Sequence, residues 1–149
     1  MRLEGKTRSE FRDFVLRMSE DSKNRFEVAE ISRYIEKIGS LYGAKQLHFR
    51  DEDAADGLPP PYHQFLETDN SKDFGLRLYC IRLSPSVVIL LNGDRKTALK
   101  AKDCPRCFPH FDRARKLAKK INQAILENAI EIDEENKDIL IDNDFELSI

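Results

Sequence analysis

An alternating strand followed by a basic segment is the part of the sequence best suited to chemistry. Residues 76–82 alternate with a period of two, which places Arg77 and Tyr79 on the same face of a strand. Residues 94–120, called here the basic segment, contain ten Lys or Arg and three Asp, a net charge of +7. Cations beside a phosphate stabilise charge on its oxygens, and a lysine of lowered pKa can carry protons. The pattern predicts a surface that meets an anionic partner.

Two cysteines in the basic segment have the spacing of half a zinc site. Cys104 and Cys107 are separated by two residues, and His110 follows three residues later. A structural zinc needs four ligands, and there is no second pair, although Cys80 or a distant histidine could complete the set. As a redox pair, the motif lacks the preceding strand and following helix expected of a thioredoxin-like centre. We therefore expect two loop cysteines and no metal.

The end of the basic segment has the pattern of an amphipathic helix over 110–128. Arg113, Lys116 and Lys120 lie along one line of this helix, which could follow a phosphate backbone or could simply be a solvated face. Residues 127–149 contain nine Asp or Glu against one Lys. The two charged regions either neutralise each other in the fold or leave a basic site beside an acidic tail.

Two further helices are predicted within a helical layer over 1–50. Thr7 and Glu10 have the spacing of a capping box, and apolar residues follow at helical intervals. A second stripe begins at Val28, and Gly43 is placed to end that helix.

An antiparallel meander over 62–98 is predicted to form the central sheet. Residues 51–61 combine four acids, one glycine and three consecutive prolines, so we expect a loop there rather than a helix or central strand. Residues 62–68, 76–83 and 86–91 read as strands, with a turn over 69–73. Residues 139–141 and 145–149 are predicted to form a C-terminal strand pair.

Composition limits the class of protein. The 149 residues, 40% of them hydrophobic, suit one domain with an α+β fold over 1–149. No apolar run approaches the roughly 20 residues of a membrane helix, and the charged N-terminus lacks a secretory signal. Three cysteines fit a reducing compartment, so we expect a cytoplasmic location. The lack of a Gly-rich phosphate loop or nucleophile elbow disfavours kinases, dinucleotide enzymes and ordinary hydrolases.

Residues 76–97 carry a resemblance to a known family. The run Leu-Arg-Leu-Tyr-Cys-Ile-Arg is followed by Val-Val-Ile-Leu-Leu-Asn-Gly-Asp-Arg-Lys-Thr and then by a basic loop and helix. This order resembles the RelE-like toxins of bacterial type II toxin-antitoxin pairs, especially their HigB-like branch. The resemblance covers about 50 residues by pattern. It implies a metal-independent endoribonuclease, without a cofactor, that cleaves messenger RNA on the ribosome and is held inactive by a cognate antitoxin protein.

The resemblance also implies roles for individual residues. Arg77 would clamp the scissile phosphate. Arg95, the catalytic Lys96 and Lys100 would supply the remaining positive field, with a lysine of lowered pKa as the proton carrier for the 2′-oxygen and the leaving oxygen. Family members often carry a Tyr or His near the C-terminus, whereas here Tyr79 and His110 are the last of each type and are the substitutes that we assign. The residues assigned to nucleic-acid binding are Arg95, Lys100, Lys102, Arg113, Lys116 and Lys120. The alternative hypothesis is a non-catalytic RelE- or ParE-like module that binds and inhibits a protein or nucleic-acid target.

Overall fold

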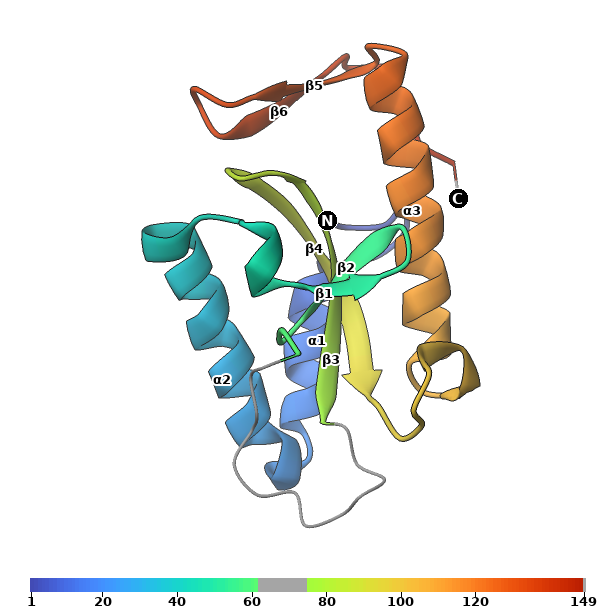
Figure 1. The fold of residues 1–149 in the computed structure, drawn as a ribbon. Helices are drawn as coiled ribbons and strands as arrows, with labels where there is room; N and C mark the ends of the chain where they lie inside the picture. Colours follow the sequence, from blue (N-terminus) through green and yellow to red (C-terminus); the bar gives the residue numbers. More distant parts are fainter. Residues whose placement is uncertain (62–74, 149) are drawn as a thin grey trace.

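The computed structural model, which describes residues 1–61 and 75–148, has the predicted α+β class. A four-stranded antiparallel sheet of order β1-β2-β3-β4 forms its centre, with two helices on one face, a third helix on the other and a separate two-stranded sheet near the C-terminus (Figure 1). The helices are α1 (Glu10–Ser19), α2 (Ser22–Lys37) and α3 (Phe108–Leu126). The strands are β1 (Arg50–Glu52), β2 (Ala55–Leu58), β3 (Leu76–Ser84), β4 (Val87–Arg95), β5 (Ile130–Asp133) and β6 (Asp138–Ile141).

The N-terminal helical layer is confirmed, although its first cap is not the predicted one. Ser9, rather than Thr7, caps α1, and its hydroxyl accepts a hydrogen bond from the Arg12 backbone amide at 3.2 Å. After α2 the chain makes a π-helical turn over Ile38–Tyr42, and this turn ends at Gly43. Gly43 has a φ of 73°, a conformation that glycine adopts without strain, so it ends the helix as predicted.

The predicted loop over 51–61 is wrong, because β1 and β2 form a hairpin that joins the central sheet. Asp56, Gly57 and Leu58 of β2 pair with Cys80, Tyr79 and Leu78 of β3. A side chain at Gly57 would displace the Glu52 side chain, since a Cβ there would lie 2.9 Å from the Glu52 Cγ. The prolines begin only at Pro59, after β2 has ended. The predicted strand 62–68 and the turn 69–73 lie outside the described residues.

Strand β3 is buried on both faces. Leu78 and Cys80 pack into a core with α1 and α2, whereas Tyr79 and Ile81 pack into a second core with α3. The alternation predicted from sequence is therefore confirmed, but neither face is open to solvent. Helix α3 begins at Phe108 rather than at 110, and its predicted apolar stripe is buried against the sheet.

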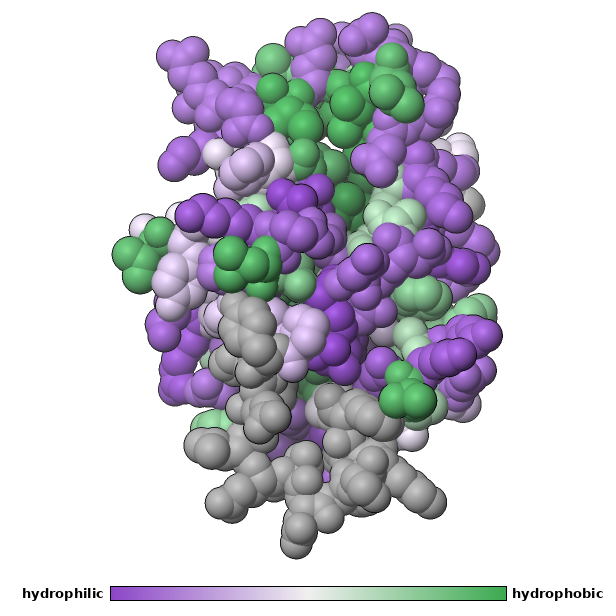
Figure 2. Space-filling view, in the orientation of Figure 1, coloured by the Kyte–Doolittle hydropathy of each residue, from purple (hydrophilic) through white to green (hydrophobic). Residues whose placement is uncertain are grey.

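The C-terminal strand pair exists, but its strands differ from those predicted. Strands β5 and β6 pair antiparallel, with Ile130 opposite Ile141 and Asp133 opposite Asp138, whereas residues 145–148 form no strand. The turn is held locally, because the Asn136 amide donates to the Asp133 carboxylate at 2.7 Å. Figure 2 shows apolar side chains gathered near this hairpin and mainly hydrophilic ones over the middle of the same face. In the described part of the chain, every helix is too short or too polar to cross a membrane.

Candidate functional site

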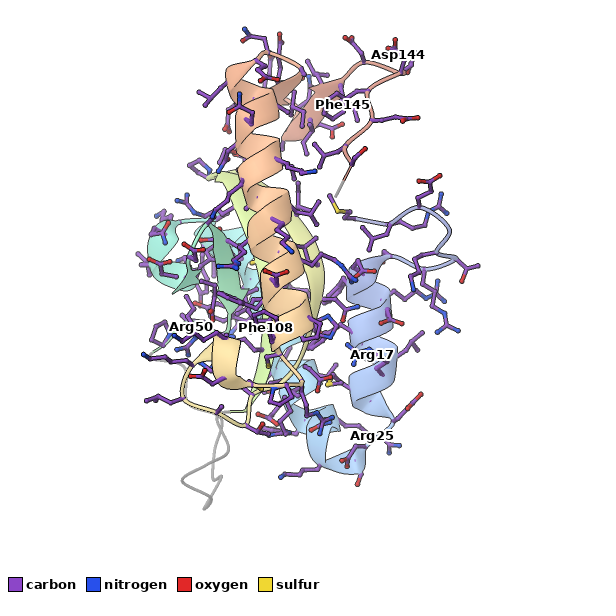
Figure 3. The ribbon with its side chains drawn as sticks, turned by 90° about the vertical axis from the view of Figure 1, so that its right-hand side faces the viewer. Arg17, Arg25, Arg50, Phe108, Asp144 and Phe145 are labelled. Atoms are coloured by element: carbon purple, nitrogen blue, oxygen red, sulfur yellow. The ribbon has the colours of Figure 1, made fainter. Side chains whose placement is uncertain are left out.

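A cleft of about 600 Å³ opens between the β1–β2 hairpin and the first turn of α3. We call it the basic cleft. Figure 3 shows α3 with this hairpin on one side and α1 on the other, and it labels Phe108 and Arg50 on the hairpin side. The lining residues are Asp51, Glu52, Asp53, Lys96, Lys100, Ala101, Lys102, Phe108, Phe111 and Arg115.

Two lining residues of the basic cleft, Glu52 and Lys96, belong to a cluster of three cations around one carboxylate, which we call its floor. Arg77 Nε lies 3.9 Å from Glu52 Oε1, and both side chains are more than nine-tenths buried. Arg50 and Lys96 act on the same carboxylate electrostatically. Neither Arg77 Nε nor Glu52 Oε1 has a hydrogen-bond partner among the described residues. Within residues 1–61 and 75–148 this long contact is the ion pair of the Arg77 guanidinium, and a buried charge paired so weakly is costly, which is typical of a site with a functional role.

Burial makes Lys96 a stronger candidate for proton transfer than an exposed lysine. Removal from water lowers the pKa of Lys96, and the positive charge of Arg77 lowers it further. Burial also raises the pKa of Glu52, against the opposing effect of Arg77. Lys96 is therefore more readily neutral than an ordinary lysine, while Arg77 stays charged and keeps the floor positive.

The walls of the basic cleft combine cations and aromatic rings with two acids of the β1–β2 hairpin, Asp51 and Asp53. Lys100 and Lys102 are exposed at its edge, while Arg115 lies over the Phe111 ring at 5.4 Å and pairs with acids beside it. Phe108 retains 39% of its surface in contact with solvent. The sequence did not reveal an aromatic wall, because Phe111 fits the core stripe of α3 and Phe108 precedes the predicted helix.

The alternation suggested that Tyr79 and Arg77 lie on an open strand face. In the structure, both side chains are buried. The exposed fraction of Tyr79 is 0%, and its ring packs against Phe111 at a centroid distance of 5.9 Å. Burial also raises the pKa of Tyr79 far above its usual value, so the hydroxyl remains protonated. Arg77 is 3% exposed, beneath the cleft. The strand pattern correctly predicted the shared face but could not show that α3 covers it.

Arg95 does not line the nucleic-acid surface for which it was predicted. Its guanidinium is buried on the α2 side of the sheet, where it pairs with the Glu27 carboxylate and donates to Asn24 Oδ1 at 2.6 and 2.9 Å. Glu27 also accepts from the Leu76 backbone amide at 3.3 Å. Arg95 therefore joins α2 to the sheet. The next residue, Lys96, lies on the opposite face of the sheet, at the basic cleft.

His110 and Arg113 line a different cleft, of about 280 Å³, between α3 and α1. His110 Nδ1 is buried without a hydrogen-bond partner among the described residues, and burial lowers the pKa of this histidine. Arg113 lies 3.6 Å from the buried Glu10 carboxylate. The structure thus separates these two residues from Lys96, because α3 stands between the two clefts.

The remaining cations of α3 face solvent. Lys116 pairs with Asp112 one turn earlier at 2.6 Å, and Lys120 donates to the Ser148 carbonyl. The ion pairs described for the basic segment join it to acids of α1, α2, the β1–β2 turn, β4 and α3 itself. They do not support neutralisation by the acidic tail as the main arrangement.

The setting of the two cysteines differs from the one predicted. Strand β4 ends at Arg95 and α3 begins at Phe108, so Cys104 and Cys107 lie after a strand and directly before a helix. Among residues 1–61 and 75–148, no group of three or more His, Cys, Asp or Glu side chains is placed to hold a metal ion.

No protein-family model matches the chain, and neither does any curated protein or solved structure with which it was compared.

Proposed function

We propose that this chain is a ribosome-associated endoribonuclease of the RelE-like kind, the toxin of a type II toxin-antitoxin pair. The observation that carries the proposal is the floor of the basic cleft, where Lys96 and Arg77 are buried together under cationic and aromatic walls. The cationic walls suit a phosphate backbone, and Phe108 offers a face on which a base can stack. The sequence pattern of residues 76–97 supports the same assignment.

The proposed reaction needs one proton acceptor and one source of positive charge. Neutral Lys96 accepts the proton of a ribose 2′-hydroxyl, whose oxygen attacks the adjacent phosphorus. The bond from phosphorus to the 5′-oxygen breaks, the leaving oxygen takes a proton from water, and a 2′,3′-cyclic phosphate and a 5′-hydroxyl result. Arg77 acts as a positioning residue, since its charge lies beneath Lys96 and favours the neutral amine. Lys100 and Lys102 bind the flanking phosphates.

The second candidate is a non-catalytic module that binds a nucleic acid or protein target through the same cleft. The burial of Tyr79 and the separate position of His110 favour it, because they leave Lys96 as the one assigned proton carrier at the cleft. Under either proposal, the cognate antitoxin would act by covering or distorting the basic cleft.

The test is expression of the whole chain in a bacterial host, with amino-acid incorporation measured after induction and messenger RNA mapped for new 5′-hydroxyl ends. We expect incorporation to fall and such ends to appear. Lys96→Met should abolish the new ends, whereas Lys37→Met, which changes an exposed lysine of α2, should leave them. Normal incorporation at high soluble expression would rule out the ribonuclease. Arrest without new RNA ends would favour the binding module.

A further inference from the structure

Cys104 caps the first turn that leads into α3. Its backbone is extended, with φ of −98° and ψ of 106°, and its carbonyl accepts from the Phe108 amide at 2.8 Å. Its sulfur accepts from the Cys107 amide at 3.4 Å, in the way that a serine hydroxyl caps a helix. The sulfur therefore lies at the positive end of the helix dipole, where a thiolate is stabilised.

A second group of donors comes from the loop after β4. The Thr97 amide lies 3.5 Å from Cys104 Sγ, and the Thr97 hydroxyl lies 3.6 Å from it. Burial raises the pKa of Cys104, but the hydrogen bonds from Thr97 and Cys107 outweigh it and bring the pKa to about 7. Cys107 differs, because burial and the neighbouring Cys104 raise its pKa to about 12. One cysteine is thus suited to be a thiolate and the other to remain a thiol.

The two sulfurs lie over neighbouring carbonyl groups at the end of β4. Cys107 Sγ is directed to the Asp94 carbonyl at 3.5 Å, while Cys104 Sγ approaches the neighbouring Arg95 carbonyl at 3.8 Å. Both sulfurs therefore lie over the end of β4, separated by a two-residue turn. Both cysteines are 0% exposed, whereas Pro105 and Arg106 between them are exposed, so a reagent would reach the sulfurs through a local opening of this turn.

We propose that Cys104 and Cys107 are a redox-active pair that closes an intramolecular disulfide by exchange with a low-molecular-weight disulfide. The Cys104 thiolate attacks one sulfur of the reagent, forming a mixed disulfide and releasing one thiolate, which takes a proton from water. Cys107 then loses its proton and attacks Cys104, which releases the second thiolate. The dithiol gives up two electrons, and the reagent becomes two thiols. This inference does not depend on the proposed ribonuclease function.

The experiment uses the whole folded chain and oxidised glutathione. After incubation, the reaction is stopped with acid, the chain is unfolded, free thiols are labelled with a maleimide, and the disulfide is located by peptide mass mapping. We expect Cys80 alone to be labelled and a Cys104–Cys107 linkage to be found. The rate should rise with pH and level off above about 7, rather than near the roughly 8.5 of an ordinary thiol.

Variants distinguish the roles of the two cysteines. Cys107→Ser should retain glutathione on Cys104, because the resolving thiol has been removed, whereas Cys104→Ser should retain free thiols throughout. Cys80→Ala is the matched control and should still form the linkage. The inference is overturned if the folded parent chain keeps all three thiols while the unfolded chain oxidises. It is also overturned if the linkage includes Cys80, or if Cys104→Ser captures glutathione in place of Cys107→Ser.

Discussion

Arg95 is a buried arginine whose charge is paired inside the protein. Arg95 pairs with Glu27 and Asn24 between α2 and the sheet. Replacing it with alanine leaves the Glu27 carboxylate buried without its charge partner. Such a loss typically costs about 3–5 kcal/mol of the free energy of unfolding.

We therefore expect Arg95→Ala to lower the denaturant midpoint strongly. Arg33→Ala is the control, because the Arg33 side chain is 64% exposed and its pair with Glu30 lies on one helix, so its effect should stay within about 0.5 kcal/mol. Urea unfolding of both variants measures the difference. Equal midpoints would show that Glu27 finds another partner when Arg95 is removed.

Lys96 should give the proposed cleavage reaction a characteristic pH dependence. Burial lowers the pKa of its folded-state amine, so the neutral, proton-accepting form appears at lower pH than for an exposed lysine. Cleavage should rise with pH and reach a plateau below the ordinary lysine value of 10.5. Initial rates on a short RNA bound to ribosomes provide the profile.

The same pKa shift has a consequence for stability that can be checked separately. The unfolded chain binds the Lys96 proton more tightly than the folded chain does, so this residue destabilises the fold at neutral pH and less so as pH rises through the folded pKa. Lys96→Met should consequently fold at least as stably as the parent while it loses cleavage. A variant that unfolds would instead mark Lys96 as a residue that stabilises the fold.

At the scale of elements, strands β3 and β4 approach each other closely at Gly93. A Cβ at Gly93 would lie 1.8 Å from the Arg77 carbonyl oxygen, so any side chain must push the two strands apart. Gly93→Ala should destabilise the protein by several kcal/mol and disturb the backbone beneath the basic cleft.

Gly39 provides the matched control for that substitution. It lies in the turn after α2, with nothing within 4 Å of an added Cβ, so Gly39→Ala should be neutral or stabilising by up to about 1 kcal/mol. Thermal unfolding of both variants is the measurement. If Gly93→Ala unfolds at the same temperature as the parent, Gly93 does not lie opposite Leu78 in the β3–β4 pair in solution.

Sequence patterns predicted the elements whose signals are local. The stripes of α2 and α3 and the alternation in β3 follow from periodicity, and Gly43 follows from its freedom at positive φ. The β1–β2 hairpin was missed because four acids, one glycine and three prolines indicated a loop over 51–61, although the prolines follow the end of β2. In the fold, Glu52 lies next to Arg77 and the Asp56 carboxylate accepts from the Arg82 amide at 2.9 Å.

Site residues were harder to predict than elements because burial depends on distant partners. Arg95 and Glu27 are 68 residues apart, and no local pattern links them. Arg95 and Lys96 are neighbours in the chain and both were assigned to the site, although the structure puts them on opposite faces of the sheet. No local pattern indicates what covers each face. Of the ten residues assigned to catalysis or nucleic-acid binding, the structure brings Lys96, Lys100 and Lys102 to one cleft, with Arg77 beneath it.

For the molecule as a whole, the separation of charge predicts how binding depends on salt. RNA bound along the basic cleft would displace condensed counterions, so its affinity should fall steeply between low and physiological salt. Replacing both Lys100 and Lys102 with alanine should reduce the slope of log affinity against log salt by about 2. Fluorescence anisotropy with a labelled RNA, repeated at several salt concentrations, measures the affinity and so gives the slope.

The control for this salt dependence is the replacement of two exposed lysines far from the basic cleft. Lys37 lies at the end of α2 and Lys45 follows the π-helical turn, and neither lines the cleft. Changing both to alanine should leave the slope as it is in the parent. If the control lowers the slope as much as the cleft variant does, RNA is held by diffuse charge and not by the cleft.

Because β3 is buried on both faces, its centre should be among the last regions to unfold locally. Residues 78–80 are paired with β2 on one side, adjoin β4 on the other and are covered by helices above and below. Their backbone amides should be the last to exchange with deuterium, at rates governed by global unfolding. The β5–β6 hairpin, where Leu140 and Ile141 are more than half exposed, should exchange early. The centre of the sheet would then act as a rigid base, while the C-terminal hairpin opens independently of it.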